Sequence, residues 1–506
     1  MSEQQTRVNQ LHSAPLSDGP EWTFDLLEQY HHEIARIAAH YRLSTYPNQI
    51  EVITAEQMMD AYSSIGMPIG YHHWSYGKKF IQTEQTYQRG QMGLAYEIVI
   101  NSDPCIAYLM EENTLPMQAL VIAHACYGHN SFFKNNYLFK SWTDAGSIID
   151  YLVFAKQYIS ECEDKYGVAE VETLLDSCHA LMNYGVDRYK RPVPRSLAQE
   201  RLKQKARAAY LQTQVNEIWR TLPRQAEDPT VLTTRYPRDP EENLLYFFEK
   251  NAPLLAPWQR EIIRIVRKMS QYFYPQKQTQ VMNEGWASFW HYTINRHLYD
   301  EGLVTDRFMM EVLHSHTNVI YQPAYNSPHY SGLNPYALGF AIFMDLRRIC
   351  EQPTAEDRAW FPEFAGSNWL DTLHFAMENF KDESFISQYL SPKVMRDLRL
   401  FTITDDDTKS YLKVAAIHDE AGYQTLRETL SAQYNLANIE PNIQVYNVDI
   451  NGDRSLTLRY VPHNRAPLAD SCQEVLRHIH RLWGFEVILE QEETNGSRII
   501  GRCPER

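Results

Sequence analysis

Residues 115–133, LPMQALVIAHACYGHNSFF, predict a helix that is apolar on nearly every side. Thr114 is a suitable N-cap residue for this helix, and Pro116 is tolerated in its first turn. A helix without a polar face is normally buried in the interior of a protein. We therefore expect this segment to form the centre of a mostly helical core, with His124 and His129 well inside it.

The two histidines are five residues apart in this segment, which separates them by about 140° around a regular α-helix. Both side chains can reach one metal ion only if the helix bulges or breaks, and Gly128 makes that possible. Buried histidines are costly unless they are hydrogen-bonded or bound to a metal. From this motif alone, two hydrogen-bonded core histidines are the alternative to a metal site.

A second polar group lies in NEGWASFWHY, residues 283–292. Glu284 and His291 are seven residues apart, within about 20° of each other on a helix, and Ser288 falls on the same side. The neighbouring Trp, Phe and Tyr residues indicate that this face is buried. A buried glutamate needs a metal or a cationic partner, and an ion pair with Arg or Lys is the alternative here.

Together, AHACYGHN and the later NEGWASF resemble the layout of the gluzincin metallohydrolases. In those enzymes a helix that carries histidines is followed by a helix whose glutamate is the third zinc ligand. The resemblance implies a divalent metal, with zinc as the expected ion, held by His124, His129 and Glu284. His291 is then a fourth ligand or a supporting group.

One departure from that layout concerns the general base, because Ala125 stands where the zincin motif has glutamate. A base from elsewhere would have to accept the proton of the attacking water. Glu97, Glu111 and Glu112 are candidates, and we assign catalytic roles to Glu112 and His291. Cys126 is a candidate ligand or nucleophile, although a buried inert thiol is the more common case.

Weaker candidates follow the Glu284 segment. His314 and His316 are placed to bring one side chain near the site. The segment 334–339, NPYALG, begins a predicted helix and is a candidate lining of the same cleft. For these residues an ordinary structural role is the alternative.

Length and composition limit the class of protein. The chain has 506 residues, which favours two or three domains, and a formal net charge of -15, which makes nucleic acid an unfavourable partner. The seven cysteines form no Cys-x-x-Cys pair, as in reduced cytoplasmic proteins. No secretory signal and no apolar run of about 18 residues is visible, so we expect a cytoplasmic protein without a membrane span.

The pattern predicts an α+β chain in three parts: a flexible N-terminus (1–20), a mainly helical core domain (21–400) and a small C-terminal domain (401–506). In the last part, strands alternate with helices in the order β-α-β-β-α-β, which is the ferredoxin-like pattern. The predicted elements are strand 411–419, helix 421–435, strands 442–450 and 455–463, helix 471–484 and strand 486–493.

Long segments of the chain resemble the family of stage V sporulation protein R (SpoVR), most closely its enterobacterial-type members. They are LSDGPEWTFDLLE (16–28), MMDAYSSIGMP (58–68), HWSYGKKF (73–80), AYEIVINSDPCIAYLMEENT (95–114), AHACYGHNSFFKNN (123–136), DRYKRP (187–192), QKQTQVMNEGWASFWHY (276–292), NPYALGF (334–340) and FKDESFISQYLSPKVMRD (380–397). The resemblance covers nearly the whole chain. It implies a bacterial cytoplasmic protein linked to spore cortex formation or, in bacteria that form no spores, to stress or starvation.

Two functional hypotheses follow. The first is a metal-dependent hydrolase that acts on an amide in a peptide or a peptidoglycan-derived substrate. The second is a non-catalytic regulatory or scaffold protein. The family resemblance implies two partners for that role, a serine kinase of the PrkA type and a von Willebrand-type protein encoded beside it. Metal content and an open coordination position distinguish the two hypotheses, because a closed four-ligand site is structural.

Overall fold

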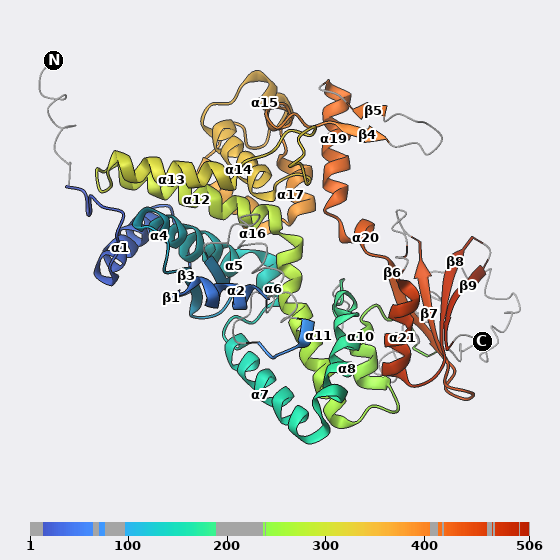
Figure 1. The fold of residues 1–506 in the computed structure, drawn as a ribbon. Helices are drawn as coiled ribbons and strands as arrows, with labels where there is room; N and C mark the ends of the chain where they lie inside the picture. The colour runs from blue at the N-terminus through green and yellow to red at the C-terminus, as the bar shows by residue number, and fades with distance from the viewer. Residues whose placement is uncertain are drawn as a thin grey trace, which may run out of the picture. The chain divides into compact units, whose positions relative to one another are not determined.

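The computed structural model describes residues 14–63, 70–75, 97–188, 236–237, 239–404, 413–416, 419–462, 468, 471–494 and 496–504. Most of these residues are helical, and small sheets account for the strands (Figure 1). Residues 1–13 of the expected flexible N-terminus lie outside the described ranges, and residues 14–20 contain no helix or strand. Within the described part of the chain, no helix has both the length and the apolar character needed to cross a membrane.

The chain divides into two compact units. The first contains the described residues up to Glu172 and those from Gln271 to Glu440, and the second contains those from Thr173 to Ser270 and from Pro441 onward. The boundary therefore differs from the one predicted near residue 400. Residues 420–433 stay with the helical core because Leu426 and Leu430 belong to its buried apolar cluster.

In the first unit the elements follow one another in this order: α1 (Phe24–His40), β1 (Asn48–Ile53), α2 (Ala55–Ser63), β2 (Glu97–Ile100), β3 (Cys105–Met110), α4 (Leu115–Ile122), η1 (Ala123–His129), α5 (Asn130–Asn135), α6 (Tyr137–Trp142) and α7 (Ile148–Tyr166). After the second unit's first segment come α12 (Gln280–Asp300), α13 (Asp306–Val319), α14 (Pro335–Glu351), α15 (Ala355–Trp360), α16 (Trp369–Asn379), α17 (Asp382–Tyr389), α18 (Pro392–Asp397), β4 (Thr402–Thr404), β5 (Lys413–Ala416), α19 (Glu420–Gln433) and α20 (Leu436–Ile439).

The predicted apolar helix is present as α4, η1 and α5, three consecutive helical segments that are almost entirely buried. Thr114 is the N-cap residue, as predicted, but its hydroxyl donates to the Glu311 carboxylate and makes no capping bond. The second predicted core helix is α12, where Trp286 and Trp290 are fully buried. These two segments lie side by side at the centre of the first unit.

A three-stranded sheet lies beside η1. Its strand order is β1-β3-β2, with β1 parallel and β2 antiparallel to the central β3. Glu97 is the first residue of β2 and pairs with Leu109 of β3. The burial of β2 alternates, with Ile98 and Ile100 buried and the Glu97 side only partly covered, so Glu97 lies on the face opposite to those isoleucines.

The second unit contains α8 (Val168–His179, which begins in the first unit), η2 (Met182–Tyr184), α10 (Leu244–Asn251), α11 (Pro257–Gln278, which ends in the first unit), β6 (Asn442–Val448), β7 (Leu456–Val461), α21 (Cys472–Trp483), β8 (Val487–Glu493) and β9 (Gly496–Cys503). Its sheet has the order β6-β7-β8-β9. β7 and β8 are parallel, and the other two pairs are antiparallel.

This sheet confirms a small C-terminal sheet domain but not the ferredoxin-like order. The strand predicted at 411–419 is β5, which pairs with β4 in a separate two-stranded sheet. The fourth strand of the C-terminal sheet is instead β9, which the sequence pattern did not indicate. Strand pairing is decided by contacts between distant segments, so the order of elements along the chain left this topology open.

Candidate metal centre

The segment that carries both histidines is a π-helix. In η1 the backbone N–H of Asn130 donates to the carbonyl of Ala125, five residues earlier. In a helix with these i→i+5 hydrogen bonds, residues that are five positions apart lie on the same face, as residues four positions apart do in an α-helix. The rings of His124 and His129 consequently lie with their centroids 4.6 Å apart. The bulge that the sequence required for a shared metal site is present.

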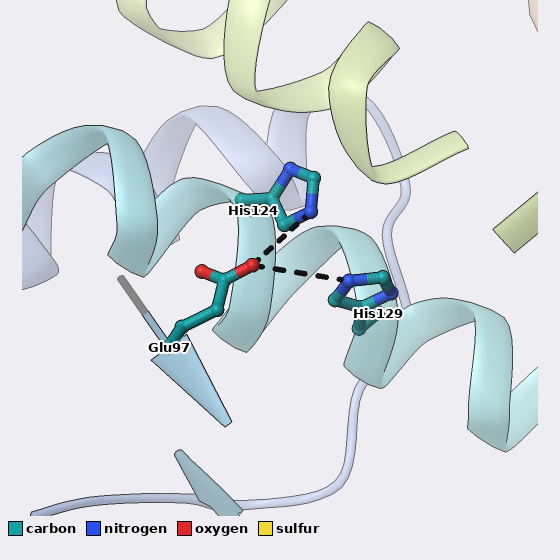
Figure 2. A group of neighbouring side chains, drawn as sticks. All are labelled: Glu97, His124 and His129. Atoms are coloured by element: carbon teal, nitrogen blue, oxygen red, sulfur yellow. Dashed lines mark ion pairs between the residues drawn. The ribbon is translucent and has the colours of Figure 1, made fainter. Parts of the chain in front are cut away.

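Glu97 reaches the two histidines from β2, as Figure 2 shows. Its Oε1 lies 3.2 Å from Nε2 of His124 and 4.0 Å from Nε2 of His129. The three ligand-type atoms all lie within 4.8 Å of one another. From sequence alone, Glu97 is only one of three candidate bases, because a single carboxylate in an apolar strand gives no local sign of what it faces.

Glu284 approaches the same two imidazoles from α12. Its Oε2 lies 3.5 Å from Nε2 of His129 and 3.8 Å from Nε2 of His124. The structure thus brings together the three predicted ligands and adds Glu97. Among the described residues, the recorded ion-pair partners of Glu284 are these histidines and not an Arg or Lys, which was the alternative considered for this glutamate.

Close backbone contacts hold the three helical segments at this distance. A β-carbon on Gly128 would lie 2.6 Å from the Ala287 α-carbon, so η1 meets α12 where a side chain is missing. On the other side of α12, a β-carbon on Gly285 would lie 2.4 Å from the Gly339 backbone of α14. Gly128, next to His129, therefore allows the close approach of η1 to α12, and Gly285, next to Glu284, allows that of α12 to α14.

The second ring nitrogen of His129 is held by the residue that precedes Glu284. Nδ1 of His129 lies 3.0 Å from Oδ1 of Asn283, and an amide oxygen only accepts. His129 therefore donates its Nδ1–H, which leaves the lone pair of Nε2 directed toward the carboxylates. This is the arrangement that fixes histidine ligands in metal sites.

Behind His124 lies a row of buried histidines. Its Nδ1 lies 2.8 Å from Nδ1 of His291, and Nε2 of His291 lies 2.7 Å from Nδ1 of His316 on α13. His291 therefore contacts the side of the His124 ring that faces away from Glu97 and Glu284, which corresponds to the supporting group rather than the fourth ligand. His316, a weaker candidate from sequence, completes the row.

The charges of the two carboxyl groups differ. Burial, and then the neighbouring Glu284, raises the pKa of Glu97 well above its ordinary value. Burial also acts to raise the pKa of Glu284, but the nearby imidazoles of His129 and His124, together with a hydrogen bond from Tyr336, outweigh it and lower that pKa. Burial lowers the pKa of His124 to about 4. In the absence of a metal, these shifts favour the ionised form of Glu284 and the protonated form of Glu97, and His124 is neutral at neutral pH.

The expected base Glu112 lies elsewhere. It is exposed in the turn after β3, where its Oε1 accepts the N–H of Ala55 at 3.3 Å. Glu111 is exposed as well, and its carbonyl accepts the indole N–H of Trp22. The carboxylate that the structure places at the histidines is that of Glu97. Cys126 is fully buried, and burial raises the pKa of its thiol well above the ordinary value, as in an inert thiol.

Tyr336 adds a hydroxyl to this group. It is the second residue of α14 and hydrogen-bonds to Glu284, and its ring is stacked on His124 with centroids 6.4 Å apart. The segment 334–339 was a weak candidate for the cleft lining, and Tyr336 is the residue through which it contacts the site.

The residues fit a divalent metal ion. Two imidazole Nε2 atoms and two carboxylates converge, which is the donor set of zinc and of iron or manganese sites. Oε2 of Glu97 and Oε2 of Glu284 are buried without a hydrogen-bond partner, a costly state that a cation would relieve. The side chains of Glu97 and Glu284 are 17% and 19% exposed, against 5% and 8% for His124 and His129, so the carboxylates lie on the less covered side of the group.

Comparisons with known proteins give the same family along most of the chain. A model described as "SpoVR like protein" matches residues 21–439, and one described as "SpoVR-like C-terminal domain" matches residues 441–494. The two matches meet near residue 440, where the chain passes for the last time from the first compact unit to the second. The chain is similar to "Uncharacterized protein YcgB" of Escherichia coli (strain K12), with 72% identity over 493 residues, 97% of each chain. No solved structure matches. The chain belongs to the SpoVR family.

Proposed function

We propose that this protein is a metal-dependent hydrolase that cleaves an amide bond in a peptide or a peptidoglycan-derived substrate. His124, His129 and Glu284 would hold one divalent ion, with zinc as the first candidate. The observation that carries the proposal is the pair of buried, unpartnered carboxylate oxygens on either side of two imidazoles that are already oriented by other groups. A catalytic rather than a structural site would need water or substrate to enter from the carboxylate side, which is the less covered one.

A bound divalent ion supplies a Lewis acid that activates water and polarises a carbonyl group. The protein's own residues would perform the proton transfers. Once Glu97 has lost its own proton on cation binding, its Oε2 would accept a proton from the attacking water and return it to the leaving amine. Tyr336, half-buried beside Glu284, would donate a hydrogen bond to the substrate carbonyl oxygen.

Glu97 would thus fill the role that Ala125 leaves open. The gluzincin-like layout supports the choice of an amide substrate, since the order of the histidine helix and the glutamate helix is the same. His291 and His316 would act on the orientation of His124 and would not contact substrate.

The alternative is a non-catalytic regulatory or scaffold protein that works with a serine kinase of the PrkA type and the von Willebrand-type protein. Ala125 is the observation that favours it, because the helix itself carries no general base. In that case the His and Glu group would hold β2, η1 and α12 together.

The test begins with metal content, measured by mass spectrometry on the purified wild type, Glu284→Ala and the control Glu112→Ala. We expect about one equivalent of metal in the wild type and the control and none in Glu284→Ala. A hydrolysis screen with peptides and muropeptides follows, in which Glu97→Gln should keep the metal and lose turnover. Absence of metal from the wild type after reconstitution would overturn the proposal. Metal without turnover, equal in wild type and Glu97→Gln, would favour the regulatory alternative.

A further inference from the structure

A pocket of about 730 Å³ lies in the first unit, and none of its lining residues belongs to the metal centre. Three segments form it: the loop between α13 and α14, the residues that follow α18, and one face of α19. The volume lies within the range of about 300–1,000 Å³ that is usual for sites of small molecules. The metal-dependent chemistry proposed above gives this pocket no role.

Aromatic rings form one wall. The ring of Tyr325 packs edge-on against Tyr330, with centroids 5.3 Å apart, and against Phe401, with centroids 5.0 Å apart. Tyr325 is 49% exposed and Phe401 is 39% exposed, although both line the pocket. Aromatic side chains that are grouped and left uncovered in a concave site favour a ligand with a planar ring.

A second feature of the pocket lining is the cationic side chain of Arg399, whose backbone conformation is unusual. Arg399 follows α18 and has φ of 52°, in the left-handed region. Its N–H donates to the Arg396 carbonyl, and the N–H of Leu400 donates to the Met395 carbonyl, so this is a Schellman C-terminus of the helix. Glycine is the residue usually found at this position, since a β-carbon there is strained.

Two other arginines share this conformation, and both have partners for their side chains. Arg42, with φ of 60°, forms an ion pair with Asp371, and Arg454, also with φ of 60°, lies over the ring of Phe485. Among the described residues, no ion pair, side-chain hydrogen bond or ring contact involves the Arg399 guanidinium. The Arg399 guanidinium is exposed, so it is free to contact a ligand in the pocket.

The remaining polar groups fit an anionic ligand. Thr429 and Gln433 of α19 add a hydroxyl and an amide to the lining. Asp397 also lines the pocket, but its carboxylate forms an ion pair with Lys393. The guanidinium of Arg399 is therefore the charged group of the lining that is left for a ligand.

We propose that this pocket binds a small anion that carries a planar ring, with Arg399 contacting the anionic group and the aromatic wall contacting the ring. The inference is independent of the metal centre, so each proposal can fail without the other. The anionic group is a phosphate or a carboxylate, and the two are separated by the probes used below.

The test is calorimetric titration of the full-length protein with adenosine 5′-monophosphate and with 4-hydroxybenzoate. Adenosine and inorganic phosphate are the probes that have only the ring or only the charge of the first anion, and phenol and acetate are those of the second. We expect one of the two ring-bearing anions to bind, and the corresponding single-feature probes to bind at least about tenfold more weakly. Whichever anion binds identifies the phosphate or the carboxylate as the recognised group.

The decisive variant is Arg399→Gly, because glycine suits the left-handed position and preserves the fold. We expect its melting temperature to be equal to or above that of the wild type, and its affinity for the anion to fall about tenfold. Arg42→Gly is the matched control, with the same conformation but outside the pocket lining, and should leave the affinity unchanged. If neither ring-bearing anion binds the wild type, or if Arg399→Gly binds as tightly as the wild type, the proposal is wrong.

Discussion

A β-carbon added to Gly128 would lie 2.6 Å from the α-carbon of Ala287 and 2.8 Å from its β-carbon. Because both contacts are with atoms fixed by the backbone, no side-chain rotation can relieve them. The absence of a side chain at residue 128 thus allows the π-helical segment and α12 to bring their histidine and glutamate side chains close to one another.

Gly128→Ala should therefore push η1 away from α12. We expect a loss of about 1–3 kcal/mol in the free energy of unfolding, as for other overpacked interiors, together with weaker metal binding. Urea denaturation and titration with Zn²⁺ measure the two effects. Gly146→Ala is the control, since its β-carbon would meet only an ordinary contact of 3.8 Å with the Asp144 side chain. Equal stability of the two variants would contradict the close approach.

The row of buried histidines predicts that metal affinity depends on His316, which contacts none of the proposed metal ligands. His316→Ala removes the partner of His291, which in turn orients His124. Loss of such a supporting group typically lowers metal affinity by about 10- to 100-fold. The absorption spectrum of the Co²⁺-substituted protein should change as well. His314→Ala is the matched control, because this exposed histidine lies on the same helix outside the row; an equal effect of both variants would rule out the supporting role.

The start of α12 depends on a buried aspartate from another helix. Asp382 is 1% exposed, and its carboxylate accepts the backbone N–H groups of Val281 and Met282, each at 2.9 Å. Asp382→Ala leaves two buried donors without partners next to Asn283 and Glu284. We expect a loss of about 2–4 kcal/mol in unfolding free energy, measured by urea denaturation, and a lower metal affinity.

A cap of another helix in the same unit gives the control for this variant. Asp419 accepts the N–H of Gly422 at 2.7 Å at the start of α19, at an exposed position. Asp419→Ala should cost about 1 kcal/mol and leave metal affinity unchanged. If Asp382→Ala costs no more than this, the aspartate does not hold the start of α12.

Metal affinity should rise with pH. The pKa of Glu97 is raised by burial and by Glu284, so a proton must leave this site when a cation enters. His124, with its pKa lowered to about 4, holds no competing proton above about pH 5. Above about pH 5 we therefore expect affinity to rise with pH, by up to about tenfold per pH unit for as long as Glu97 holds its proton in the metal-free protein. Competition with a chromophoric chelator measures this slope.

Glu97→Gln carries no titratable proton at this position, so its affinity should vary much less over the same pH range. The wild type and the variant are compared in the same buffers, with Glu112→Gln as the control that keeps the wild-type slope. A flat profile for the wild type would show that Glu97 is already ionised before the metal binds.

The polar residues on buried helices were the part of the site that could be predicted from sequence. His124, His129 and Glu284 stand out because a charged or polar side chain in an apolar helix needs a partner, and Gly128 indicated where the helix could deviate. The π-helix confirms that deviation. The family and the mostly helical fold are confirmed too.

Contacts between distant segments could not be predicted in this way. Glu97 enters the site through the pairing of β2 with β3, and nothing in the residues around it indicates which face of that strand meets the histidines. Asp382 stands about 100 residues from the helix it caps. The order of the C-terminal sheet likewise depends on which strands meet, and β5 joins β4 instead.

The π-helical turn also bears on how such a site is recognised among proteins. One residue fewer between His124 and His129 would restore an α-helix and bring the pair to the four-residue spacing of familiar metal-binding helices, with the same face presented. The chain can thus be regarded as a one-residue insertion variant of that pattern. A search written for the shorter spacing passes over it, even though the two imidazoles are presented to a common point.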